Sequence, residues 1–395
     1  MMPAGSHPPT SPPPRTPVVE SRLPQVGTTI FTVMSALAQK HGAVNMGQGF
    51  PDFDCDPRLL DAVDAAMRAG LNQYPPMTGV PLLRERIATK IEALYGHAYD
   101  PETEITVTAG ATQAILTAVL ALVRPGHEAI VLDPCYDSYA PSVVLAGATP
   151  IHVPLTPGSF APDFDRIKSA MTPRTSAIVI NSPHNPSGRV WSEDEMEQLA
   201  ELLRPTGMVV ISDEVYEHMV YDGVHQSVAR NPELAARSVL ISSFGKTYSV
   251  TGWKIGYAAA PAALSDEFRK VHQFNVFTVN APMQHGIAAF MADPSHHLDL
   301  AGFYRRKRDL FRAGLARTRL RALPCDGTYF QCADYSAVSE LAEADFCRWL
   351  TTAIGVAAIP LSALYANAYE QRIARFCFAK KDETLTLAVD RLASL

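Results

Sequence analysis

The sequence lacks the cysteine patterns of a zinc site or a redox centre. Its six cysteines stand at positions 55, 135, 325, 332, 347 and 377, without a CxxC pair and without histidines at zinc-ligand spacing. We therefore expect no metal site, and free thiols in a reducing, cytoplasmic compartment.

A membrane span, a signal peptide and a basic surplus are also missing. The longest apolar run, residues 114–123, has about half of the ~20 residues that a membrane span needs, so it predicts a buried helix. The first 24 residues contain eight prolines and no apolar signal-peptide core, and we expect residues 1–24 to form a disordered Pro-rich tail. A formal net charge of −6 over 395 residues, without a long run of like charge, indicates neither nucleic acid nor a membrane as a partner.

What the sequence does contain is a repeated order of strand, turn and helix. In five stretches, 105–123, 128–139, 176–188, 208–219 and 238–249, a short β-branched run leads into a polar or glycine-rich turn and a helical pattern. This order predicts the α/β class, with a mostly parallel central sheet flanked by helices. We expect a large domain over 50–288, a smaller α+β domain over 289–395, and an N-terminal segment over 25–49 that joins the small domain.

The predicted strands all end in polar or glycine residues. Because ligands of open parallel sheets bind beyond the carboxyl ends of the strands, these residues should meet in one crevice. They are Gly110, Thr112, Asp133, Asn181, Asn185, Asp213, Ser243 and Lys246.

Two lysines stand close together in the stretch SSFGKTYSVTGWKIGY, residues 242–257. Lys246 follows an apolar strand in a turn of small residues, where desolvation lowers the pKa of an amine and favours the neutral form that makes a Schiff base. A solvated loop lysine is the alternative interpretation. Lys254, together with Ser243, would suit the binding of an anion.

The stretch TAGATQA, residues 108–114, predicts a strand that turns into a helix through small residues. The free N–H groups of Gly110, Ala111 and Thr112 at the start of that helix can bind a phosphate, helped by the helix dipole. Many such turns bind nothing, so the stretch supports a phosphate site only in combination with the two lysines.

Four further residues suit specific recognition, although each has a purely structural alternative. Asp213, at the buried end of a strand, either faces a cationic ring nitrogen, with Tyr216 near a ring oxygen, or forms a helix N-cap or an ion pair. Asn185 stands before Pro186 in a rigid turn that can contain a cis bond. Arg375 lies between apolar neighbours on a strand and fits a carboxylate, with a buried salt bridge as the alternative.

These residues, in this order, resemble the fold-type-I pyridoxal-phosphate aminotransferases of the aspartate aminotransferase superfamily (class I/II). The resemblance covers residues 22–395 and rests on the motifs GQGFPDFD, VTAGATQA, SPHNPSG, ISDEVYEH, SSFGKTYSVTGWKIGY and RFCFAKK. Within the superfamily the chain is most similar to the kynurenine/glutamine transaminase branch and to methionine aminotransferases.

The resemblance implies a role for each matching position. Lys246 would bind the cofactor, pyridoxal 5′-phosphate, covalently, and Asp213 would pair with its ring nitrogen. The other implied cofactor ligands are Asn185 and Tyr216 at the phenolic oxygen, Tyr136 stacked on the ring, and Gly110, Ala111, Thr112, Ser243 and Lys254 at the phosphate, with Tyr74 from the other subunit of a homodimer. The implied substrate ligands are Arg375 and Asn185 at the α-carboxylate, the backbone of Gly49, and Ile30 and Phe50 along the side chain.

The chain departs from the family pattern in two places. Lys254 stands where many relatives have arginine, and residues 272–284 contain no arginine for a carboxylate on the substrate side chain. The resemblance therefore implies ping-pong transamination through Lys246 of a methionine, aromatic or glutamine-like L-amino acid with a 2-oxo acid. A cysteine S-conjugate β-lyase on the same site and a non-catalytic ligand-sensing protein are the alternatives.

Overall fold

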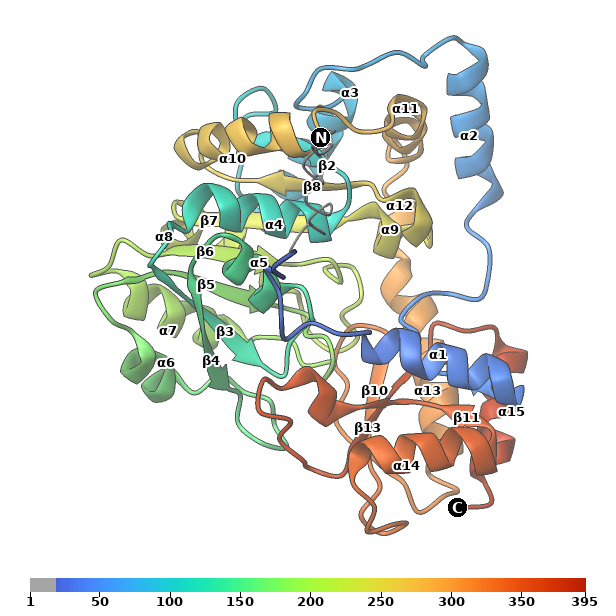
Figure 1. The fold of residues 1–395 in the computed structure, drawn as a ribbon. Helices are drawn as coiled ribbons and strands as arrows, with labels where there is room; N and C mark the ends of the chain where they lie inside the picture. Colours follow the sequence, from blue (N-terminus) through green and yellow to red (C-terminus); the bar gives the residue numbers. More distant parts are fainter. Residues whose placement is uncertain (1–18) are drawn as a thin grey trace, which may run out of the picture.

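The computed structural model describes residues 19–395 of the chain. Residues 1–18, the greater part of the predicted tail over 1–24, lie outside the described residues. Figure 1 shows a large sheet with helices around it and, beside it, a smaller sheet made from the C-terminal part of the chain.

Seven strands form the large sheet, in the spatial order β2-β8-β7-β6-β5-β3-β4. Neighbouring strands run parallel except β8, which is antiparallel to both β2 and β7. The strands are β2 Ile105–Thr108, β3 Glu128–Asp133, β4 Thr149–Pro154, β5 Thr175–Asn181, β6 Val209–Asp213, β7 Ser238–Ser243 and β8 Gly256–Ala259. The predicted mostly parallel sheet flanked by helices is confirmed, although the prediction omits β4 and β8.

Both faces of the large sheet are buried, which explains why its strands read as continuous apolar runs. Val131 and Val179 pack in one hydrophobic cluster with side chains of α4, α5 and α10. Ile130 and Ile178, the alternate residues, pack in another with side chains of α3, α7 and α11. The helices near this sheet are α3 Pro81–Tyr95, α4 Ala111–Leu122, α5 Tyr139–Leu145, α6 Phe164–Ala170, α7 Glu193–Leu203, α8 Pro232–Ala235, α9 Phe244–Thr247 and α10 Ala262–Asn275.

The smaller sheet has four strands in the order β12-β13-β10-β9. Its strands are β9 Arg321–Ala322, β10 Phe330–Asp334, β12 Ile359–Pro360 and β13 Ile373–Cys377, and the helices beside it are α13 Leu300–Leu315, α14 Glu343–Trp349 and α15 Asp382–Leu392. The N-terminal helix α1 (Ile30–His41) lies beside these C-terminal elements (Figure 1), and β1 (Val44–Asn45) pairs in parallel with β11 (Val356–Ala357). Residues from both ends of the described chain therefore build this part of the molecule.

Helices α2 (Pro57–Arg68) and α11 (Ala281–Phe290) pack closely against each other at one end of the large sheet (Figure 1). A Cβ atom on Gly286 would lie 2.4 Å from Val63 Cγ2, so glycine permits this approach. The remaining short helices are α12 Ser295–Leu298, η1 Val228–Arg230, η2 Thr251–Trp253, η3 Leu350–Ile354 and η4 Leu361–Leu364.

The described residues also bear on the expectations about the apolar run, membrane spans and cysteines. The apolar run 114–123 falls in α4, whose side chains are largely buried, as predicted. Among the described helices, none combines the length and apolarity needed to cross a membrane. All six cysteines are free thiols.

Candidate active site

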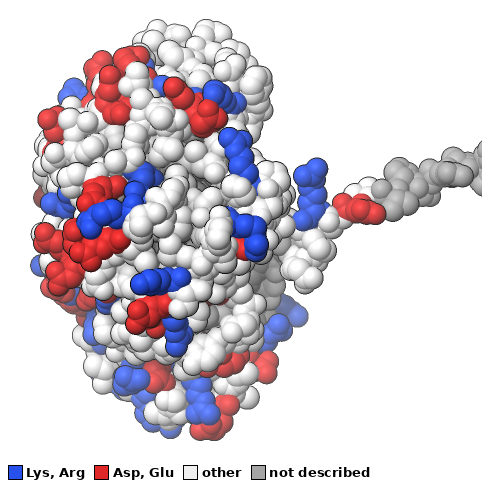
Figure 2. Space-filling model, turned by 90° about the vertical axis from the view of Figure 1, so that its left-hand side faces the viewer, with Lys and Arg blue, Asp and Glu red and all other residues white. Residues whose placement is uncertain are grey.

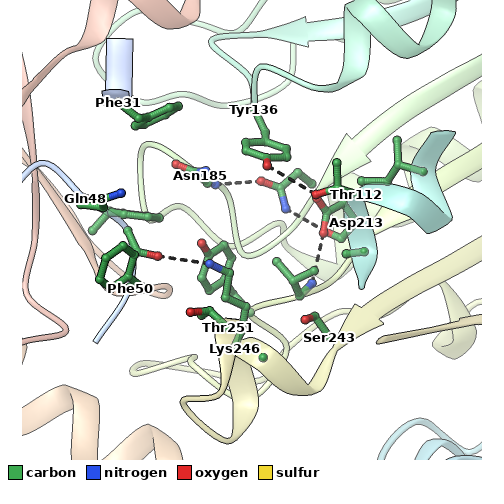
Figure 3. A pocket seen from close by; sticks show the side chains of 18 of the residues that line it. Phe31, Gln48, Phe50, Thr112, Tyr136, Asn185, Asp213, Ser243, Lys246 and Thr251 are labelled. Carbon is green, nitrogen blue, oxygen red and sulfur yellow. Dashed lines mark hydrogen bonds between the residues drawn. The ribbon is translucent and has the colours of Figure 1, made fainter. Parts of the chain in front are cut away.

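A pocket of about 260 Å³ opens where the carboxyl ends of β5, β6 and β7 meet the N-terminus of α4 and the small sheet. Asn181, Asp213 and Ser243, which line it, are the last residues of those three strands. Figure 3 shows Thr112, Asp213 and Ser243 on one side of the pocket, Phe31, Gln48 and Phe50 on the other, and Lys246 between them. The crevice predicted at the strand ends is therefore present.

Most of the predicted site residues come together in this pocket. Those that line it are Gly49, Phe50, Ala111, Thr112, Tyr136, Asn185, Asp213, Tyr216, Ser243, Lys246, Lys254 and Arg375. Asp133, which ends β3 at the same edge, does not line the pocket: its carboxylate contacts His152 Nδ1 at 2.9 Å and accepts from Ala366 N–H at 3.0 Å. Asp133 thus holds a neighbouring strand and a loop together.

Lys246 lies in α9, one helical turn after β7, and its amine points into the pocket (Figure 3). Nζ donates to the hydroxyl oxygen of Tyr329 at 2.9 Å and to the carbonyl oxygen of Gly49 at 3.2 Å. Burial lowers the pKa of this amine to about 8, because removal from water disfavours its charged form. The side chain is therefore not a solvated loop lysine, and a substantial fraction of the amine is neutral near pH 8.

The N-terminus of α4 offers an anion-binding group of donors. Gly110 is the N-cap residue with φ of 78° and no side-chain cap, and within the described chain the N–H groups of Ala111 and Thr112 have no acceptor. Lys254 lies next to this turn. A Cβ atom placed on Gly110 would be only 3.3 Å from Lys254 Nζ. The lysines that pair with a carboxylate in the described chain are Lys90, Lys270 and Lys307, so the charge of Lys254 is available to a ligand along with the Ser243 hydroxyl.

Asp213 presents a buried carboxylate to the pocket and forms no ion pair within the described chain. Oδ2 accepts a hydrogen bond from the hydroxyl of Tyr139 at 2.6 Å, and Oδ1 accepts from Val215 N–H at 3.2 Å. Burial nevertheless raises the pKa of Asp213 to about 6. The ion-pair alternative is not observed among the described residues, and a cationic group in the pocket would return this pKa toward its ordinary value.

Arg375 lies on β13 and is only 1% exposed. Nη1 donates to Asn185 Oδ1 and Nη2 donates to the Gly47 carbonyl, both at 2.8 Å, while Nε has no partner among the described residues. The guanidinium also lies 4.0 Å from the ring centroid of Phe330. The buried salt bridge considered as an alternative is absent from the described structure, so this cation is left for a ligand.

The Asn185–Pro186 peptide bond is cis, which the sequence of the turn allowed.

Besides Asp133 and the N-cap residue Gly110, the predicted residues Ile30 and Tyr74 do not line this pocket. Ile30 and Phe31 of α1 both pack against the hydrophobic cluster of the small sheet, but Phe31 lines the pocket and Ile30 does not. Tyr74 is 81% exposed, and its ring contacts Phe277 with the centroids 5.4 Å apart. Neither position contradicts the role implied by the resemblance, and both roles stay predictions.

Sequence reasoning missed several residues that line or support the pocket. They are Phe31, Gln48, Tyr139, Thr251 and Phe330 in the lining, and Tyr329 beneath Lys246. Gln48 stands inside the motif GQGFPDFD, and Tyr139 ends the stretch 128–139 described above, so attention to every polar residue of these segments could have found them. Tyr329 and Phe330 read as ordinary strand residues, and no local signal distinguishes them.

The surface shown in Figure 2 mixes lysine and arginine with aspartate and glutamate over the large-sheet side of the molecule. No basic patch stands out on that face, in agreement with the net charge of −6. Within residues 19–395 no cluster of histidine, cysteine and carboxylate side chains could hold a metal ion. The chemistry of the pocket therefore depends on its lysine, arginine, carboxylate and amide groups.

An α/β fold with a lysine, a carboxylate and an anion-binding helix end in one pocket is typical of enzymes that work on amino groups. The chain belongs to the class I and II aminotransferases, because the model of that family, "Aminotransferase class I and II", matches residues 41–392. Members of this family use pyridoxal phosphate.

Individual relatives agree with the family assignment. Methionine aminotransferase of Escherichia coli is 50% identical over 96% of this chain and 98% of its own length, and human kynurenine–oxoglutarate transaminase 1 is 34% identical over 90% and 93%. A probable N-succinyldiaminopimelate aminotransferase of Mycobacterium tuberculosis is 44% identical over 95% and 98%. Among solved structures, an Escherichia coli protein with an identified methionine aminotransferase function matches with a TM-score of 0.95 and 49% identity, over 96% of this chain and 100% of that one.

Proposed function

We propose that this protein is a pyridoxal-phosphate-dependent aminotransferase that transfers the amino group of a methionine, aromatic or glutamine-like L-amino acid to a 2-oxo acid. The observation that carries the proposal is the position of Lys246. Its amine, with a pKa lowered to about 8, lies in one pocket with the carboxylate of Asp213, the anion-binding end of α4 and the unpaired Arg375.

The residues present fit pyridoxal phosphate. The phosphate matches the free N–H groups of Ala111 and Thr112, the Ser243 hydroxyl and the Lys254 ammonium. A protonated ring nitrogen matches Asp213, which is a buried carboxylate without an ion pair in the described chain. Further expected contacts of the ring are Tyr136 at its face and Asn185 and Tyr216 at its phenolic oxygen.

The chemistry follows from what these side chains can hold and move. When bound, the cofactor supplies an electron-withdrawing ring that stabilises negative charge at the substrate Cα. Asp213 keeps the ring nitrogen positively charged, and Arg375 with Asn185 binds the substrate α-carboxylate. The Lys246 amine, once free, would remove the substrate Cα proton as a general base and, as a general acid, return it to the cofactor carbon that it had bonded. We propose two such half-reactions, in ping-pong order.

The substrate side chain is expected to be uncharged or aromatic. The cations that line the pocket in the described chain are Lys246, Lys254 and Arg375, and each already has a proposed role. The wall beyond the amine consists of Phe31, Phe50 and Gln48, which gives apolar surface and one amide (Figure 3). Amino acids with further carboxylates on the side chain, such as the N-succinyldiaminopimelate for which the mycobacterial relative is named, are therefore expected to be poor substrates of this protein.

We also propose a homodimer in which Tyr74 reaches the cofactor phosphate of the partner subunit. Tyr74 is 81% exposed and does not line the pocket of its own chain. Phe274 and Phe277, which are 87% and 45% exposed, lie in the same region as Tyr74, so this surface carries several large apolar side chains.

A half-reaction screen tests the proposed function. Each amino acid is mixed with the cofactor-loaded enzyme, and loss of the visible absorption band of the lysine-bound cofactor is recorded. We expect fast loss with methionine, phenylalanine, kynurenine or glutamine, slow loss with aspartate, and none with Lys246→Ala. Release of pyruvate and ammonia from a cysteine S-conjugate without any 2-oxo acid would instead favour the β-lyase. The absence of the band, or unchanged transamination by Lys246→Ala, would refute the assignment.

A further inference from the structure

Gln48 occupies the wall of the pocket that a substrate side chain would face. It lies with Phe31 and Phe50, across the pocket from Thr112 and Asp213 (Figure 3). Phe31 and Phe50 offer only apolar surface, so Gln48 supplies the hydrogen-bonding group of this wall.

A chain of hydrogen bonds fixes which end of the Gln48 amide faces the pocket. Gly47 N–H and Gln48 N–H both donate to Asn45 Oδ1, at 3.1 and 3.2 Å. Because a backbone N–H can donate only to the amide oxygen, the other end of Asn45 must be its NH₂ group. That group donates to Ser35 Oγ at 3.3 Å, and Ser35 in turn donates to Gln48 Oε1 at 2.8 Å.

The opposite orientation of Gln48 would break this chain. Ser35 Oγ could accept from both NH₂ groups, but the Ser35 hydroxyl hydrogen, which now bonds Gln48 Oε1, would lose this acceptor. Gln48 Oε1 is thus engaged by Ser35, whereas Nε2 has no protein acceptor among the described residues and carries two hydrogens. In Figure 3 the amide nitrogen of Gln48 points toward the cavity.

We propose that Gln48 is a specificity-determining residue that donates a hydrogen bond to the side chain of the substrate. The inference rests on the proposed aminotransferase function and names the substrate class that Gln48 favours among the candidates above. That class consists of L-amino acids with an unbranched stem and a neutral hydrogen-bond acceptor beyond Cβ, such as an amide or ketone oxygen or, more weakly, a thioether sulfur. A cationic side chain finds no acceptor at this position, because the oxygen of Gln48 is turned toward Ser35.

The first experiment measures binding of two unreactive acids of equal shape to the cofactor-loaded enzyme by calorimetry. One is 5-oxohexanoate, whose ketone can only accept, and the other is 5-methylhexanoate. In Gln48→Leu, the dissociation constant of 5-oxohexanoate should rise by about three- to tenfold relative to that of 5-methylhexanoate. This factor corresponds to the loss of one neutral hydrogen bond. Gln39→Leu is the matched control, since Gln39 is an exposed glutamine of α1 outside the pocket, and it should leave the ratio unchanged.

Two further variants separate hydrogen bonding from shape. Gln48→Glu keeps the size of the side chain but replaces the donor by a carboxylate, so it should weaken 5-oxohexanoate binding more than Gln48→Leu does. Ser35→Ala leaves Gln48 in place but releases its amide, and should produce a smaller shift in the same direction. The ratio of kcat/KM for glutamine and 2-amino-5-methylhexanoate should follow the binding ratio.

The outcomes distinguish this inference from the proposed function. An enzyme that transaminates while Gln48→Leu and Gln48→Glu leave both ratios unchanged would overturn the role of Gln48 alone. A wild-type protein that transaminates no amino acid would instead overturn the proposed function.

Discussion

The amine of Lys246 and the hydroxyl of Tyr329 lie 2.9 Å apart, and the hydroxyl in turn lies 2.7 Å from the Gly49 carbonyl oxygen. Since the carbonyl can only accept, Tyr329 donates to Gly49 and its oxygen accepts from Lys246. Tyr329 therefore holds the amine at a fixed position while the amine is not bonded to the cofactor. The residues that meet here come from three distant parts of the chain.

Tyr329→Phe tests this contact through the pKa of Lys246. The hydroxyl oxygen stabilises the charged amine, so its removal should lower the pKa of Lys246 from about 8 by ~1, because hydrogen bonds to charged groups contribute about 1.5–3 kcal/mol. The rate at which cofactor-free protein takes up pyridoxal phosphate should rise with pH as the amine becomes neutral. In the variant, the midpoint of that rise should move to lower pH.

Tyr304→Phe is the control for loss of a phenol near Tyr329. The Tyr304 ring is buried, and its centroid lies 5.7 Å from that of the Tyr329 ring. Its hydroxyl makes no hydrogen bond to Lys246. The midpoint should stay in place in this variant. Equal midpoints in Tyr329→Phe and wild type would show that Tyr329 does not influence the amine.

Asp213 should make the cofactor-free protein less stable as the pH rises. Its pKa in the folded protein, about 6, is above the ordinary value of 3.8, so between these values the folded state holds a proton that the unfolded chain has released. Stability from this group is therefore lost as the pH rises from about 4 to about 6. Asp213→Asn cannot ionise, and its free energy of unfolding relative to wild type should increase by up to about 3 kcal/mol between pH 4 and pH 7.

Urea denaturation of both cofactor-free proteins at pH 4 and pH 7 measures this difference. The same variant should bind the cofactor more weakly, because it no longer offers a charge to the ring nitrogen. A difference in stability that does not change with pH would contradict the raised pKa of Asp213.

The strand ends of the large sheet could be predicted because a local pattern defines them. Asp213 and Ser243 each end a run of apolar β-branched residues, and Lys246 follows one of these runs. Parallel topology then brings the ends to one edge, so a local pattern and one rule of sheet architecture suffice. The rule fails for Asp133, which ends its strand in the same way but pairs with His152 on β4, a strand that the prediction omits.

The contacts made across long stretches of chain could not be predicted from local patterns. Tyr329 meets Lys246 across 83 residues, and Arg375 meets Gly47 across 328 residues. The resemblance implied Ile30 as a substrate contact, but the sequence of α1 could not decide whether Ile30 or its neighbour Phe31 faces the pocket. That choice depends on how α1 packs beside the small sheet, which no residue of α1 specifies alone.

Gly110→Ala should weaken cofactor binding both by straining the backbone at this position and by placing a methyl group against Lys254. Gly110 has φ of 78°, which disfavours alanine, and the new methyl group would lie 3.3 Å from Lys254 Nζ. We expect the dissociation constant of pyridoxal phosphate to increase by at least about tenfold, the effect of disturbing one charge-assisted contact. Gly126→Ala is the matched control, because Gly126 has φ of 80° and nothing within 4 Å of its Cβ position. Similar weakening in both variants would assign the effect to backbone strain alone.

Arg375→Lys should raise KM for amino acids by about ten- to hundredfold, the value of one charge-assisted hydrogen bond, since a point charge replaces a planar guanidinium whose two ends are held by Asn185 and Gly47. The loss should be specific to the α-carboxylate. With 3-(methylthio)propylamine, which is methionine without that group, the variant and wild type should deplete the visible band of the lysine-bound cofactor at similar, slow rates. Arg372→Lys is the control from the same segment, because Arg372 pairs with Glu340 at the surface. An equal loss with the amine and with methionine would mean that Arg375 only supports the fold around Asn185, and would contradict its role in carboxylate binding.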